Sequence, residues 1–159
     1  MRDHKKLRAF ELADEIVPLV YQLTRDFPPQ EVYGLTAQIR RAAISVTSNI
    51  VEGCSRESQV EYFRFLEIAF GSLRELDYQL QLAIRLGYTE NHQAKECLEK
   101  IQEALKVLGA LVLSMRLQLH PCLIDRQPRL ESQVPWREPS TRGKQSPPPC
   151  NAPSPVNLG

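Results

Sequence analysis

The sequence lacks an excess of either charge. Its 20 Lys and Arg residues nearly balance its 19 Asp and Glu residues, which leaves a formal net charge of +1. Proteins that bind nucleic acids over a broad surface are usually strongly basic. A nucleic-acid role for this chain would therefore depend on a local group of cations rather than on the charge of the whole domain.

Long apolar runs are also missing. No stretch of about 18 uncharged apolar residues occurs, so we expect no transmembrane helix. The start of the chain, MRDHKKLRAFELADE, contains no apolar segment of the kind that a secretory signal peptide needs. The cysteines Cys54, Cys97, Cys122 and Cys150 are scattered and form no CxxC pair, a pattern typical of reduced thiols. These absences predict a cytoplasmic protein with no membrane partner.

Residues suited to catalysis or cofactor binding are scarce. None of the three histidines has a glutamate three residues before it, which is the spacing that metal sites in helical bundles use. His92 and Cys97, about one turn later, are a poor ligand set, and a surface histidine and a packed thiol are the simpler interpretation. No serine has a base in a triad context, and no glycine-rich turn follows a strand. We therefore expect no catalytic residue, metal, cofactor or small-molecule substrate, and we rank an enzyme last among the possible functions.

Proline divides the chain into two parts. Nine of the 12 prolines fall between Pro121 and Pro155, in a segment without apolar periodicity. Such a segment cannot bury enough surface to offset the entropy that ordering it would cost. We predict a helical domain over residues 4–118 and a disordered tail over residues 119–159. The PxxP-like spacing and Trp136 in this tail leave a docking peptide open, although an idle extension fits the composition better.

Apolar spacing in the domain predicts four helices. They cover residues 7–25, residues 34–53, residues 58–87 with Gly87 as the C-terminal cap, and a last segment with apolar residues at helical spacing from Ala94 to Leu119. Pro18 is expected to kink the first helix. The connections are short, and short connections place successive helices antiparallel. The predicted fold is an all-α, antiparallel up-down-up-down four-helix bundle.

The core positions of the first helix can also be assigned from spacing. We expect one set of residues to point inward and a second set to lie alongside it. The inward set is Phe10, Ala13, Val17 and Val20, and the second set is Leu12, Ile16, Leu19 and Leu23.

The second helix contains an unusual stretch of small residues, RRAAISVTSNIVEG, at residues 40–53. Its bundle-facing stripe is centred on Ile39, and small side chains allow another helix to approach closely. Ile44 and Val51 lie about 120–140° away and form a second apolar shoulder. With Ala43 and Thr47 they are the candidate oligomer interface. A middle helix that merely touches two helices of its own bundle explains the shoulder equally well.

The residues resemble a known family. The stretches YGLTAQIRRAAISVTSNIVEG and FLEIAFGSLRELDYQLQLAIRLGY are similar to those of the four-helix bundle proteins encoded in intervening sequences of bacterial 23S ribosomal RNA genes. The resemblance covers residues 7–118 and excludes the tail. Two positions depart from the family pattern: Thr47 stands where proline is common, and Pro18 interrupts a helix that usually contains none.

The resemblance implies an antiparallel four-helix bundle that assembles into pentamers and has no known active site. A distant relative of similar form is the accessory protein of diversity-generating retroelements, which binds a reverse transcriptase and nucleic acid. The number five rests on the resemblance and not on any spacing in the sequence.

Two functions remain compatible with the sequence. The first is a homo-oligomeric scaffold that contacts RNA or a ribonucleoprotein, with Arg40 and Arg41 as the candidate nucleic-acid contact. A sparse basic strip at Arg64, Arg74 and Arg85 supports it, although neighbouring glutamates also explain these arginines as ordinary surface ion pairs. The alternative is a protein–protein adaptor or retroelement accessory factor that binds a reverse transcriptase without its own catalysis. The near-neutral charge favours the adaptor.

Overall fold

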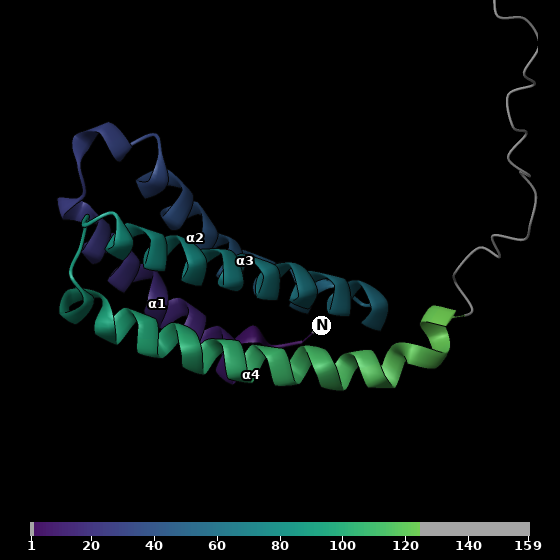
Figure 1. Cartoon of the computed structure of the whole chain (residues 1–159). Helices are drawn as coiled ribbons and strands as arrows, with labels where there is room; N and C mark the ends of the chain where they lie inside the picture. The colour runs from purple at the N-terminus through teal and green to yellow at the C-terminus, as the bar shows by residue number, and fades with distance from the viewer. Residues whose placement is uncertain (1, 125–159) are drawn as a thin grey trace, which may run out of the picture. The chain divides into compact units, whose positions relative to one another are not determined.

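The computed structural model describes residues 2–124, and four long α-helices account for most of them (Figure 1). They are α1 (Arg8–Leu23), α2 (Leu35–Ser55), α3 (Gln59–Arg85) and α4 (Asn91–Ile124). Single 3-10 turns occur at His4–Lys6, Thr24–Asp26 and Pro29–Glu31. No β-strand occurs in the described residues. The predicted all-α class with four helices is confirmed.

Each long helix packs against two others, in the cyclic order α1, α2, α3, α4 and back to α1. Hydrogen bonds show how the ends of α1 and α2 meet. The Arg2 backbone N–H donates to the Cys54 carbonyl oxygen at 3.0 Å, and Arg40 Nε donates to Thr24 Oγ1 at 2.8 Å. The start of α1 therefore lies beside the end of α2, and the end of α1 lies beside the start of α2. The predicted up-down-up-down order requires successive helices to run antiparallel, and these contacts meet that requirement for α1 and α2.

The core is built from the apolar seams of the four helices. Leu73, Leu76 and Leu80 of α3 are fully buried, and Ile101 and Leu108 of α4 lie in the same cluster. These residues follow one another at steps of three, four or seven along each helix, which places them on a single face. The helical apolar spacing expected in residues 58–87 and from Ala94 to Leu119 is therefore matched by buried residues on α3 and α4.

The core face of α1 agrees only in part with the expected one. Ala13 and Val20 are buried as predicted, but Leu12 and Ile16 are buried with them, whereas Phe10 and Val17 are only partly buried. On a helical wheel Phe10 and Val17 lie about 100–120° from Ile16, so they occupy the edge of the buried face. Helix α1 continues through Pro18, which is exposed, and the kink expected there stays a prediction.

The most extensive contact between helices is that of α2 with α3, and it uses the small residues of α2. A Cβ atom added to Gly53 would lie 2.9 Å from Phe65 Cβ and 3.3 Å from Tyr62 Cδ2. Farther along the same contact, the Ser45 and Ser72 hydroxyl oxygens share a hydrogen bond at 2.9 Å. The small side chains of residues 40–53 therefore let α3 of the same chain approach, because little side chain stands between the two helices.

Helix α3 ends as expected, and α4 extends farther than expected. Gly87 has φ +73°, and its N–H donates to the Ile84 carbonyl oxygen at 3.0 Å, so it caps α3. Helix α4 does not stop at residue 118 but continues to Ile124. The apolar seam of α4 extends past residue 118, because Leu119 is buried. Residues 119–124 are thus helix and not tail, and the rest of the predicted tail, with Trp136, lies outside the described residues.

We searched the described residues for membrane-spanning helices and for clusters of metal ligands. No described helix is both long enough and apolar enough to cross a membrane. Residues 2–124 contain no cluster of three or more His, Cys, Asp or Glu residues that could hold a metal. His92 is exposed beside Glu90, with Nδ1 3.0 Å from Oε2, and Cys97 is buried in the core. These two residues do not form a ligand pair.

Two glycine substitutions test the close α2–α3 approach. Gly53→Ala forces a methyl group against Phe65, and overpacking costs about 1–3 kcal/mol against a helix-propensity gain of about 1 kcal/mol. We expect a net loss of about 1 kcal/mol in the free energy of unfolding. Gly71→Ala on α3 is the matched control, because no atom lies within 4 Å of its added Cβ, and it should gain about 0.5–1 kcal/mol. Urea unfolding measures both, and equal gains would contradict the close approach.

The reactivity of Cys97 tests the burial of the core. Burial raises the pKa of the Cys97 thiol to about 12, so at pH 8 only about one thiol in ten thousand is the reactive thiolate. In a chain with Cys122→Ser and Cys150→Ser, the native protein should react with a thiol reagent at least about 100-fold more slowly than the same chain in urea. The native rate should rise with pH, because a thiol with a raised pKa gains thiolate only as the pH approaches that pKa. Rapid reaction of both remaining thiols at pH 8 would show that this core is open.

Candidate oligomer and nucleic-acid interfaces

The apolar shoulder of α2 is exposed on the bundle. Ile44 is 43% exposed and Val51, two turns later, is 39% exposed. Thr47 lies between them, and its hydroxyl donates to the Ile44 carbonyl oxygen at 2.9 Å. Ala43 is only 1% exposed. It lies within about 40° of Ile39 on the helical wheel, inside the core stripe. The structure therefore places Ala43 in the core, and the surface of the candidate interface consists of Ile44, Thr47 and Val51.

The shoulder faces the α1 side of α2, and α1 extends it. Arg40, one turn before Ile44, lies over the ring of the exposed Tyr21 on α1, with 4.8 Å between the guanidinium carbon and the ring centroid. On the same side of α1 lie Phe10 and Val17, both partly buried. We call this surface the α1–α2 strip; its members are Phe10, Val17, Tyr21, Ile44, Thr47 and Val51.

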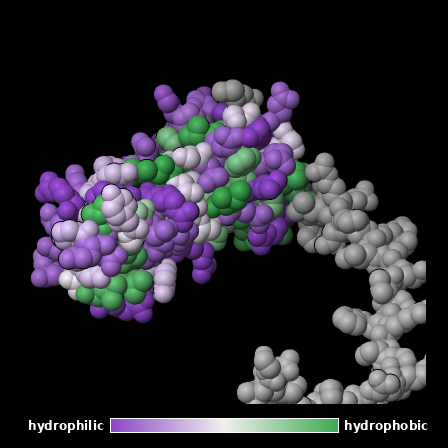
Figure 2. All heavy atoms as spheres, turned by 90° about the horizontal axis from the view of Figure 1, so that it is seen from above, coloured by the Kyte–Doolittle hydropathy of each residue, from purple (hydrophilic) through white to green (hydrophobic). Residues whose placement is uncertain are grey.

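Only the α2 half of this strip was predicted from the sequence, because Phe10 and Val17 were assigned to the core. Their offset of about 100–120° from Ile16, and of about 140–160° from Leu12, was the available signal. Exposed apolar surface is not confined to this strip. Figure 2 shows several separate apolar patches on the face seen from above, each bordered by hydrophilic side chains.

The guanidinium of Arg40 forms hydrogen bonds within the chain. Its Nε donates to Thr24 Oγ1 at 2.8 Å and its Nη2 donates to the Thr24 carbonyl oxygen at 3.3 Å. Thr24 is buried, and its hydroxyl in turn donates to the Val20 carbonyl oxygen at 2.8 Å. The guanidinium therefore ties the start of α2 to the end of α1.

Arg41 points elsewhere. It is exposed, its Nη2 donates to Gln38 Oε1 at 2.7 Å, and the same nitrogen is 3.6 Å from Glu75 Oε1 on α3. Adjacent residues on a helix lie about 100° apart. Arg40 consequently faces α1 while Arg41 faces α3, and the structure does not bring the two predicted contact residues into one cationic patch.

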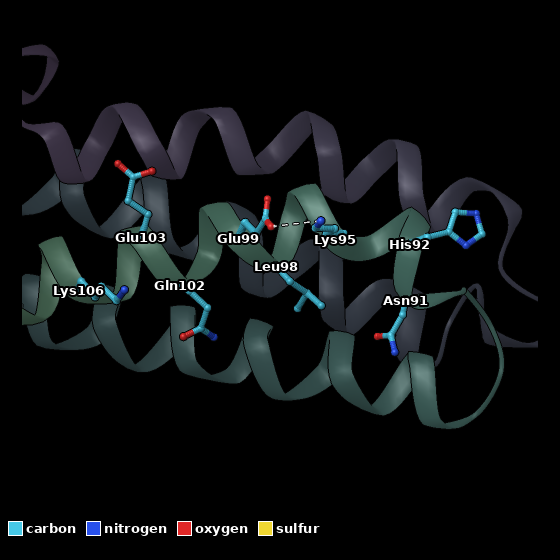
Figure 3. A pocket seen from close by; sticks show the side chains of 8 residues that line it. All are labelled: Asn91, His92, Lys95, Leu98, Glu99, Gln102, Glu103 and Lys106. Atoms are coloured by element: carbon cyan, nitrogen blue, oxygen red, sulfur yellow. Dashed lines mark ion pairs between the residues drawn. The ribbon is translucent and has the colours of Figure 1, made fainter.

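A hollow of about 720 Å³ along α4 does not resemble a small-molecule site. All eight lining residues come from α4, and Figure 3 shows their side chains fanning out from this single helix. Lys95 and Glu99 form an ion pair with each other at 3.9 Å. Ligand sites are usually concave, mostly apolar and furnished with a few converging polar groups. This hollow is an open helix face.

The unequal roles of the two arginines give a stability prediction. Arg40→Ala removes two hydrogen bonds to the buried Thr24, and a charge-assisted bond contributes about 1.5–3 kcal/mol. We expect Arg40→Ala to lower the free energy of unfolding by about 1–2 kcal/mol. Arg41→Ala, the neighbouring control, should change it by less than about 0.5 kcal/mol because its ion pair is exposed. Urea unfolding of both variants measures the difference, and equal losses would reject the anchoring role of Arg40.

Comparison with known proteins agrees with the fold. A crystal structure of a protein of unknown function from the S23 ribosomal protein family of Bacteroides thetaiotaomicron is 28% identical to this chain. The match covers 65% of this chain and 94% of that one, with a TM-score of 0.55. No curated protein matches the chain.

The family itself is shown by the sequence model of the 23S rRNA-intervening sequence protein, which matches residues 5–110. These residues include the small-residue helix and all of α3, the two segments on which the resemblance rested. The chain belongs to the 23S rRNA-intervening sequence protein family.

Proposed function

We propose that this chain is a non-enzymatic scaffold that works as a homo-oligomer of four-helix bundles and contacts RNA. The observation that carries the proposal is the α1–α2 strip, where Ile44 and Val51 remain exposed on an otherwise well-packed helix. Burial of apolar surface contributes about 25 cal/mol per Å². A second copy of the chain covers this surface in the proposed assembly.

The proposed assembly is a closed ring. A ring requires a heterologous contact, in which the α1–α2 strip of one copy meets a different surface of the next copy. Five copies is the number that the family resemblance implies, and a pentamer is the assembly that we propose. The RNA contact is supported by the family, whose description refers to the 23S rRNA. Repetition of one weak contact around a ring would supply avidity that a single near-neutral bundle lacks.

The alternative is a protein–protein adaptor, such as a retroelement accessory factor. It is favoured by the intramolecular bonds of Arg40 and Arg41, which leave neither guanidinium without a partner. The two functions differ in a direct measurement. An oligomer that binds no RNA at low salt supports the adaptor, because electrostatic contacts with phosphates are strongest there.

A charged substitution in the strip tests the assembly. Ile44→Glu should separate the subunits while it leaves helix content unchanged, because a carboxylate would have to lose its hydration in the interface. Ile68→Glu on α3 is the matched control, since Ile68 is 43% exposed, as Ile44 is. Light scattering gives the mass of each variant, and circular dichroism gives its helix content.

Three results would contradict the proposed assembly. One is a wild-type monomer at micromolar concentration, which would assign Ile44 and Val51 to the ordinary surface of a single bundle. Another is an unfolded Ile44→Glu variant, which would place the residue in the intramolecular core. The last is dissociation by both substitutions, which would show that the effect does not belong to the strip.

A further inference from the structure

We propose that single-stranded RNA binds along the face formed by α3 and α4, on Arg74, Tyr78, Arg85 and Lys106. The inference rests on the proposed RNA contact and adds the surface and the form of RNA that it takes. Neither Arg40 nor Arg41 lies on this face. We call the surface around these four residues the α3–α4 face.

Cations and aromatic rings alternate along this side of α3. Arg74, Tyr78 and Arg85 fall within about 40° of one another on a helical wheel. The Arg74 guanidinium carbon lies 6.0 Å from the centroid of the Phe70 ring, and the Arg85 guanidinium carbon lies 5.9 Å from that of Tyr78. Tyr78 is 59% exposed. An exposed ring with a cation before it and a cation after it can stack a base while the cations meet the adjoining phosphates.

These cations form no ion pair in the described part of the chain. Within residues 2–124, ion pairs of 4.0 Å or less engage Arg41, Lys95 and Arg116, but none engages Arg74, Arg85 or Lys106. The described part of the chain is nearly neutral as a whole, so three cations without partners on one face are a local positive surface. A local surface of this kind is what the charge balance of the sequence requires of any nucleic-acid contact.

Helix α4 supplies the second wall. Gln102 Nε2 donates to Asp77 Oδ1 at 3.0 Å, which shows where the two helices lie side by side. Lys106 is four residues beyond Gln102, and Arg74 is three residues before Asp77, so both cations lie near the same level of the bundle. Between the walls is a hollow of about 370 Å³, lined by Arg74, Asp77, Tyr78, Gln81, Gln102 and Leu105.

The carboxylate in this hollow, that of Asp77, accepts hydrogen bonds from neighbouring amide groups. Asp77 is partly buried and accepts a hydrogen bond from Gln81 Nε2 at 3.1 Å on Oδ2, in addition to the bond from Gln102 on Oδ1. Both oxygens are therefore held by amide groups and not by a cation. A second hollow, of about 260 Å³, follows beside Phe70 and Leu113 and extends the same face.

The arrangement fits a single strand better than a duplex or an acidic peptide. Arg74 and Arg85 are 11 residues apart, about 16 Å along the helix axis, which spans several nucleotides of a single strand. The bases of a duplex are stacked on one another and cannot reach Tyr78. An acidic peptide would use the cations but gain little from the ring.

Binding of a labelled single-stranded RNA of roughly 12 nucleotides to the full chain tests the inference by fluorescence anisotropy at several salt concentrations. Arg74→Glu with Arg85→Glu should weaken binding at least about tenfold and reduce the salt slope by about 1.4, because two phosphate contacts are lost. Tyr78→Ala should weaken binding by about tenfold, whereas Tyr78→Phe should bind within about twofold of wild type because it keeps the ring. A duplex RNA of equal length should bind more weakly than the single strand.

The control is Arg25→Glu with Arg41→Glu, which makes the same change in net charge on exposed arginines that are paired with Asp26 and Glu75. It should bind the single strand far better than the Arg74→Glu, Arg85→Glu variant. Light scattering must show the wild-type mass for every variant, so that a loss of avidity is not mistaken for a loss of contact.

Several outcomes would overturn the inference. Equal losses in the two double variants would mean that only net charge matters, and a larger loss in the control would return the contact to Arg41. Equal binding of Tyr78→Ala and wild type would remove the stacking platform. These results leave the proposed RNA contact standing, because wild type still binds. Failure of wild type to bind any RNA would instead reject the RNA contact of the proposed function together with this inference.

Discussion

The close approach of α2 and α3 is the constraint on which the rest of the bundle depends. Gly53 leaves no room for a Cβ atom beside Phe65, and the Ser45 and Ser72 hydroxyl groups meet directly across the same contact. Large side chains in the stretch of residues 40–53 would push the two helices apart. The unusual composition of that stretch is therefore explained within one chain, before any second subunit is considered.

This contact also decides what α2 presents on its other side. A helix that turns its small residues toward α3 places Ile44 and Val51 toward α1, where they remain partly in solvent. Arg40 covers only one end of the α1-facing side of α2, where it contacts Thr24 and Tyr21. The intramolecular packing and the proposed intermolecular surface are thus two consequences of one helix rotation. Substitutions that loosen the α2–α3 contact are expected to disturb the α1–α2 strip as well.

Periodicity predicted the helices and the exposed shoulder because both depend on the angle between residues of one helix. Leu73, Leu76 and Leu80 lie on one seam whatever the neighbours are. The errors arose where a second helix decides the outcome. Phe10 was placed in the core by its helical spacing from Ala13 and Val17, but the rotation of α1 buries Leu12 and Ile16 more deeply. The nucleic-acid contact expected at Arg40 and Arg41 stays a prediction, and their partners on α1 and α3 direct the two guanidinium groups to different sides of α2.

A second helix also decides how a nearly neutral bundle can present a local cationic face. Charges on helix surfaces neutralise one another only where the register brings opposite signs together, as Arg116 and Glu67 are, 2.6 Å apart. Arg74 and Arg85 have glutamates near them in sequence, which favoured ordinary ion pairs. Glu75, however, is one residue beyond Arg74, about 100° around α3, where it lies 3.6 Å from Arg41 instead. The Glu75 carboxylate thus pairs with Arg41 of α2 and lies away from the α3–α4 face. Arg74 and Arg85 on that face remain without an ion pair, beside the exposed ring of Tyr78.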